Sequence, residues 1–188
     1  MKWSWKIVNF LGIDVCLHTT FFLLIGWIAL SCWLQENSLV AVLSGVGFIL
    51  ALFASVVFHE YGHALTARRF GIKTRDITLY PIGGVARLER ITADPKQELW
   101  VDLAGPAVNI VIAIIFFLWL LITSALDPLS SLSLTGGSFL ERLMVTNLFL
   151  VGFNLIPAFP MDGGRVLRAL LATRLEYTRA TQIAASVG

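Results

Sequence analysis

Residues 39–63 decide the fold, because a long apolar run, LVAVLSGVGFILALFASVVF at 39–58, ends in the cluster HEYGH at 59–63. A membrane-spanning helix needs about 20 predominantly apolar residues, and the run before the cluster carries no charge. The stretch therefore predicts a helix that crosses a membrane. It also predicts that two histidines and a glutamate lie at the end of that helix.

The composition of the whole chain points the same way. Of 188 residues, 57% are hydrophobic and 14% are charged, whereas a soluble globular domain is about 45–50% apolar and about 25% charged. These figures disfavour a soluble domain, and they exclude disorder, which requires low hydrophobicity and high charge. The net charge of +2 is too small to indicate nucleic-acid binding. Two cysteines, Cys16 and Cys32, make neither a disulfide framework nor a Cys-rich metal site.

Three further runs resemble the first in length and polarity. Together the four runs predict membrane spans at about 17–34, 39–66, 103–126 and 139–157. The run at 17–34 is longer than the apolar part of a secretory signal, which has about 7–15 residues, and no clear cleavage site follows it. We therefore expect this run to be retained. We therefore expect residues 1–188 to form a single all-α membrane bundle of about four transmembrane helices.

The basic residues predict the orientation of these spans. All of the 14 Lys and Arg except Arg142 fall before the first span, between the second and third, or after the fourth. Because loops rich in Lys and Arg stay in the cytoplasm, we expect a multi-pass protein of a prokaryotic cell membrane with both ends cytoplasmic. The second and fourth spans then both run inward, and their C-terminal ends meet at one face.

The stretch at about 72–91 differs from the spans in composition. Two short alternating runs flank Gly83-Gly84, which predicts a small membrane-associated β-hairpin with its turn at the two glycines. Trp3–Val8 and Ile13–Val15 could add further strands at the N-terminus.

His59-Glu60-Tyr61-Gly62-His63 carries the sharpest chemical signal in the chain. On a helix, residues i and i+4 share one face, so both histidines can bind one Zn²⁺ while Glu60 acts as a general base beside it. Ionisable side chains are costly inside a membrane span, which favours a functional role. The alternative is that the span ends at Phe58 and that these groups form a solvated helix end.

A catalytic zinc site also needs a third protein ligand and an open position. Asp162 closes the fourth span, where Pro157 and Pro160 break the helix, and the orientation of the spans brings it to the face of the histidine pair. We expect Asp162 to be the third ligand. The alternative is that it caps a helix that begins at Gly163.

Two motifs together resemble the site-2 protease family (M50) of intramembrane zinc metalloproteases. They are His59-Glu60-x-x-His63 and Asn154-x-x-Pro157-x-x-Pro160-x-Asp162-Gly163-Gly164. Three further stretches resemble the branch that lacks a PDZ domain and often carries CBS domains, namely 80–86, 104–109 and 177–180. The usual core of that branch has six spans, whereas we count four, and no CBS domain lies within this chain.

The resemblance implies a set of site residues with distinct roles. They are zinc ligands at His59, His63 and Asp162, a catalytic acid/base at Glu60, an oxyanion contact in the cleft at Asn154, and a hairpin at Gly83 and Gly84 that helps to receive an unwound substrate strand.

These roles make an intramembrane zinc endopeptidase with one zinc per chain the expected function. It would cleave transmembrane segments of membrane proteins, in regulated intramembrane proteolysis, by attack of a zinc-bound water that Glu60 deprotonates. The expected partners are a transmembrane protein substrate and the lipid bilayer, and no nucleic acid is expected. The sequence leaves open whether the chain forms a homo-oligomer. The alternatives are a non-catalytic membrane metal sensor or transporter, and an inactive homologue that acts as a scaffold.

Five other polar residues carry weaker expectations. Asn109 could serve in helix packing or at the site. We expect His18 to lie at the interface or in a hydrogen bond rather than on zinc. Asp102 is expected in a solvated helix turn, and Arg165 and Arg168 at phospholipid headgroups.

Overall fold

A computed structural model describes residues 3–89, 94–123 and 137–187. Its elements follow in the order β1 (Ser4–Phe10), β2 (Ile13–His18), α1 (Thr20–Glu36), α2 (Leu39–Arg69), β3 (Thr74–Tyr80), β4 (Gly83–Leu88), α3 (Pro95–Ile122), α4 (Phe139–Asn154), α5 (Asp162–Ala172) and α6 (Tyr177–Val187). The predicted ends of the hairpin at 90–91 and of the third span at 124–126 lie outside the described residues.

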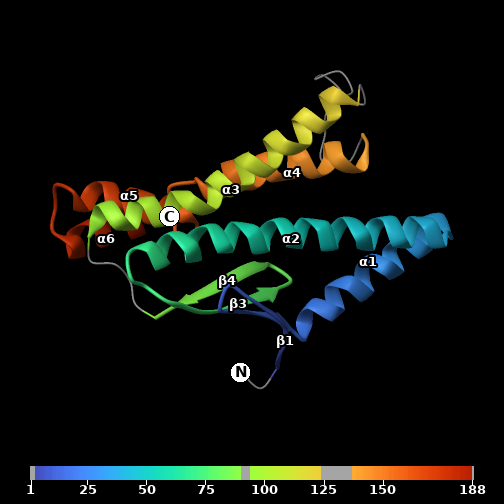
Figure 1. Cartoon of the computed structure of the whole chain (residues 1–188), viewed down its shortest axis with the longest axis horizontal. Helices are drawn as coiled ribbons and strands as arrows, with labels where there is room; N and C mark the ends of the chain where they lie inside the picture. Colours follow the sequence, from blue (N-terminus) through green and yellow to red (C-terminus); the bar gives the residue numbers. More distant parts are fainter. Residues whose placement is uncertain (1–2, 90–93, 124–136, 188) are drawn as a thin grey trace.

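Helix α2 lies between the sheet on one side and helices α3 and α4 on the other (Figure 1). Gly62 allows α3 to approach α2 closely, because a Cβ atom there would lie 2.6 Å from the carbonyl oxygen of Ala104. Tyr61, on the other side of α2, donates a hydrogen bond of 3.1 Å to the carbonyl of Phe10 in β1. One segment of α2 therefore holds both neighbouring layers in place.

Among the described helices, α2 and α3 are long and apolar enough to cross a membrane. They have 31 and 28 residues, whereas α1 has 17 and α4 has 16. A helix rises about 1.5 Å per residue, so α4 extends for only about 24 Å, less than the ~30 Å hydrocarbon core of a typical bilayer. Two of the four predicted spans are thus supported by the structure, and the count of four is not confirmed.

Strands β1 to β4 form one sheet in sequence order. β1 and β2 are antiparallel, β2 and β3 parallel, and β3 and β4 antiparallel, so the two suggested N-terminal strands are present. Ile13, Val15 and Ile77 of this sheet are buried against Tyr61 and Ala64 of α2. The sheet is therefore attached to the helix that carries the histidine pair.

The predicted turn at Gly83-Gly84 is wrong. Tyr80 pairs with Gly83, so the turn is made by residues 81–82 and both glycines belong to β4. Glycine is required at 84 for a different reason, because a Cβ atom there would lie 2.9 Å from Cγ of Glu60. Gly84 thus allows β4 to pass close to the glutamate of α2.

Candidate metal centre

His59 and His63 lie one turn apart on the same face of α2 and are both 6% exposed. Their Nε2 atoms are 3.0 Å apart. The alternative of a solvated helix end is therefore wrong, because α2 continues to Arg69 and the two rings are enclosed. The helical spacing alone accounts for this pair.

Asp162 brings the third donor from the start of α5. Its Oδ2 atom lies 3.1 Å from Nε2 of His59 and 3.2 Å from Nε2 of His63. The capping position of α5 is occupied by Met161, so the alternative of Asp162 as an N-cap is wrong.

The chain between α4 and α5 holds Asp162 in position by close backbone packing. Gly163 lies against the loop after α4, since a Cβ atom there would be 2.4 Å from the carbonyl oxygen of Leu155. Gly164 is similarly close to Ala158, at 2.7 Å from its carbonyl carbon. The two glycines after the aspartate therefore allow α5 to start directly beneath this loop.

A second set of contacts orients the two imidazole rings. Nδ1 of His59 donates to Oδ1 of Asn109 at 3.1 Å, and Nδ1 of His63 donates to the carbonyl of Val101 at 2.7 Å. Both partners only accept, so both rings carry their proton on Nδ1 and present a free Nε2 lone pair. Asn109 is therefore a site residue, and only its polarity within an apolar run signalled this in the sequence.

Gly105 was not predicted as a site residue. A Cβ atom there would lie 2.2 Å from Nε2 of His63 and 2.7 Å from Cε1 of His59. Glycine at this position of α3 therefore leaves the space that both rings occupy. The Gly105-Pro106 pair inside an apolar helix was the available signal.

The three donor atoms suit a tetrahedral zinc ion. Two imidazole nitrogens and one carboxylate oxygen form the donor set of many catalytic zinc sites, with bonds of about 2.0–2.2 Å that place donors roughly 3.3 Å apart. The separations here are 3.0, 3.1 and 3.2 Å. His59, His63 and Asp162 therefore could hold one ion and leave a fourth position open.

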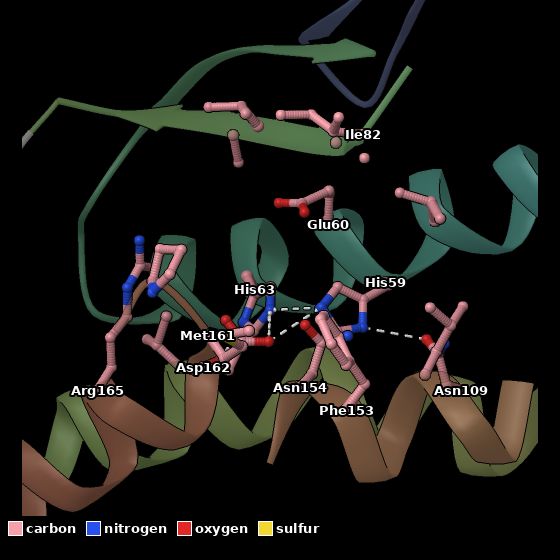
Figure 2. Close-up of a pocket in the computed structure, with 18 of the residues that line it drawn as sticks. His59, Glu60, His63, Ile82, Asn109, Phe153, Asn154, Met161, Asp162 and Arg165 are labelled. Carbon is pink, nitrogen blue, oxygen red and sulfur yellow. Dashed lines mark hydrogen bonds and ion pairs between the residues drawn. The ribbon is translucent and has the colours of Figure 1, made fainter. Parts of the chain in front are cut away.

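A cavity of about 570 Å³ opens over this centre. Glu60 and Asn154 line it together with the three donors, and Gly83 and Gly84 of β4 form its opposite wall. In Figure 2, Glu60 lies between β4 and the two histidines. The structure thus brings all seven predicted site residues to one cavity, although they come from three separate parts of the chain.

The remaining predictions have mixed outcomes. His18 lies 2.7 Å from Oγ1 of Thr20 and stacks on Tyr80, so its hydrogen-bonded role is confirmed. Asp102 is only 3% exposed, so its expected solvation is wrong. Arg168 binds Glu98 instead of facing headgroups. Both corrections have one cause, because α5 packs against the first turns of α3 and encloses them.

The known proteins that this chain resembles are described as peptidases or zinc metalloproteases. The family model described as Peptidase family M50 matches residues 47–136 and 130–188. "Zinc metalloprotease MJ0392" of Methanocaldococcus jannaschii is 44% identical over 190 residues, which is 100% of this chain and 51% of that protein. "Putative zinc metalloprotease sll0528" of Synechocystis is 39% identical over 88% of this chain and 44% of that protein.

A solved structure agrees with these relatives. The "Site-2 Protease from Methanocaldococcus jannaschii" superposes with a TM-score of 0.68 at 38% identity, over 99% of this chain and 80% of that chain. The chain spans about half the length of the curated relatives it matches.

Proposed function

Because the chain belongs to peptidase family M50, a family of membrane metalloproteases, we propose that it is an intramembrane zinc endopeptidase of the site-2 type. Its substrates would be transmembrane segments of other membrane proteins. The observation that carries the proposal is the convergence of His59, His63 and Asp162 within 3.2 Å of one another, in a cavity that Glu60 also lines.

His59, His63 and Asp162 would hold the zinc. When bound, zinc supplies Lewis acidity, which lowers the pKa of a water molecule toward about 7 and polarises a peptide carbonyl. The hydrogen bonds from the two Nδ1 atoms to Asn109 and Val101 keep both rings aimed at the ion.

Glu60 would handle the proton. Its carboxylate faces the cavity from the same turn of α2 as His59 but is not one of the converging donors, so it is available as a base. It would take a proton from the attacking water and give it to the nitrogen of the breaking peptide bond. Asn154 lines the same cavity and would donate a hydrogen bond to the developing oxyanion.

The edge strand β4 would receive the substrate. It is the last strand of the sheet, and its glycines 83 and 84 wall the cavity without side chains. A helix hides its carbonyls in internal hydrogen bonds, so the substrate must unwind before it is cut. An unwound strand could add to the edge of β4 by backbone hydrogen bonds.

The membrane arrangement completes the proposal. Residues 1–188 would form a single core with four spans and both ends in the cytoplasm. Helices α1 and α4 are each shorter than the hydrocarbon core, so they would cross it together with the residues that flank them. The Lys and Arg residues lie nearly all before α1, between the last turn of α2 and the first turn of α3, or after α4, and this distribution supports the orientation.

One experiment tests the function. Purified protein loaded with zinc should cleave a detergent-solubilised transmembrane substrate, and Glu60→Gln should abolish cleavage while it keeps one zinc per chain. Cysteine accessibility on both faces of sealed vesicles would test the orientation in parallel. Full activity in Glu60→Gln, or cleavage without metal, would show that the mechanism is wrong.

A further inference from the structure

Arg165 is a side chain of the cavity to which the proposed function gives no task. It lies three residues after Asp162, is exposed, and lines the same cavity as the three converging donors. Figure 2 shows its side chain rising from α5 toward β4, on the opposite side of the site from Asn109. Among the residues that the structure describes, Arg165 has no hydrogen-bond or ion-pair partner.

Arg168, almost one turn later on α5, shows the contrasting case. Its Nε atom donates to Oε1 of Glu98 at 2.8 Å, and its guanidinium lies over the rings of Phe159 and Tyr177. Arg168 thus has a structural task that uses its charge. Arg165 acts electrostatically on Asp102 without a hydrogen bond to it, so its hydrogen-bond donors are left for a ligand in the cavity.

The chemistry of the cavity restricts that ligand. Of the lining residues that the structure describes, Arg165 is the one whose side chain is permanently positive. A guanidinium binds carboxylates through paired, charge-assisted hydrogen bonds. A substrate strand along β4 that passes the three donors would bring its own side chains to this guanidinium.

We propose that Arg165 is a specificity-determining residue that binds an acidic side chain of the substrate; this inference rests on the proposed function. Arg165 lies near Asp102, in the first turns of α3, on the opposite side of the site from Asn109. The acidic residue therefore belongs to the part of the substrate that leaves the site on this side. Arg165 follows Asp162 by three residues on α5, which is a rise of about 4.5 Å along the helix. An extended substrate strand advances about 3.3 Å per residue, so we expect the acidic residue within about three residues of the scissile bond.

Binding to an uncleaved peptide tests this directly. The probe is a fluorescent apolar peptide with Glu at one of the three positions on that side of its centre, compared with the same peptide carrying Gln. Kd is measured with zinc-loaded Glu60→Gln protein in detergent, so that cleavage plays no part. We expect the Glu peptide to bind about tenfold more tightly at one position.

Variants of the same protein test whether Arg165 causes the tighter binding of the Glu peptide. Adding Arg165→Gln should bring the ratio of the two Kd values to about one, and adding Arg165→Glu should favour a Lys peptide instead. Arg174→Gln removes an exposed arginine that does not line the cavity and should leave the tenfold ratio. The proposal is wrong if no position discriminates Glu from Gln, or if the ratio survives Arg165→Gln.

Two further outcomes separate the alternatives. If Arg165→Gln weakens binding to vesicles of anionic lipid while the peptide ratio is unchanged, Arg165 binds headgroups and the proposal is wrong. If the Glu peptide binds tenfold more tightly but wild-type protein cleaves neither peptide, the carboxylate site is supported and the proposed protease function is refuted.

Discussion

Asn109 of α3 and His59 of α2 meet side chain to side chain, with Oδ1 of Asn109 at 3.1 Å from Nδ1 of His59. An amide oxygen only accepts, so the ring keeps its proton on Nδ1 and its lone pair on Nε2. Asn109 is fully buried. The tautomer that a metal requires is therefore fixed by a neighbouring helix.

Replacing this asparagine should weaken metal binding. Asn109→Leu removes the acceptor, so we expect zinc affinity to fall about 10–100-fold, measured by competition with a chromophoric chelator. Asn147→Leu is the matched control, because Asn147 is equally buried but bonds to Ser55 and Leu143. Equal losses in the two variants would contradict an orienting role for Asn109.

Gly105→Ala should remove the metal without unfolding the protein. The new methyl group would lie 2.2 Å from Nε2 of His63, so a ring must leave its position, and zinc content should fall well below one per chain. Gly152→Ala adds the same group where nothing lies within 4 Å and should bind zinc normally. Metal analysis and circular dichroism give the two readouts; a fully metallated Gly105→Ala protein would refute this steric argument.

Gly84→Ala should separate catalysis from metal binding. A Cβ atom there would press on Glu60 and, at 3.1 Å, on Cγ1 of Val56. We expect kcat/KM to fall at least about tenfold, as general-base catalysis is worth about 10²–10⁴-fold, with zinc content unchanged. Gly47→Ala, which meets no atom within 4 Å, should keep full activity. Loss of zinc in Gly84→Ala would point to the ligands instead.

The pair of Arg168 and Glu98 should govern stability. Their side chains are 12% and 3% exposed, and breaking a buried ion pair from one side costs about 3–5 kcal/mol. Arg168→Gln and Glu98→Gln should therefore each lower the thermal midpoint in detergent. The double variant should lose less than the sum, because neither charge is left unpaired. Additive losses would show that the two residues act independently.

Local patterns predicted part of the site well. The spacing of His59 and His63 needs only helical geometry, and Asp162 followed from the direction in which two spans were expected to run. The close approach of β4 to Glu60 could not be predicted this way, because it depends on how the sheet packs on α2. Gly84 was accordingly assigned to a turn when it is part of the strand.

The same limit explains the errors at the start of α3. Asp102 and Arg168 lie 66 positions apart in the sequence, and nothing near either residue signals that α5 covers the first turns of α3. Both were therefore expected in contact with water or headgroups. Residues whose environment is set by one helix were predictable, and those whose environment is set by a distant one were not.

The chain order of the three donors has a consequence for biogenesis. His59 and His63 are available as soon as α2 is made, but Asp162 follows 99 positions after His63. A nascent chain thus holds only two of the three donors until α5 has emerged and docked. If the proposed protease needs the metal for cleavage, it stays inactive toward neighbouring membrane proteins until its own assembly is almost complete.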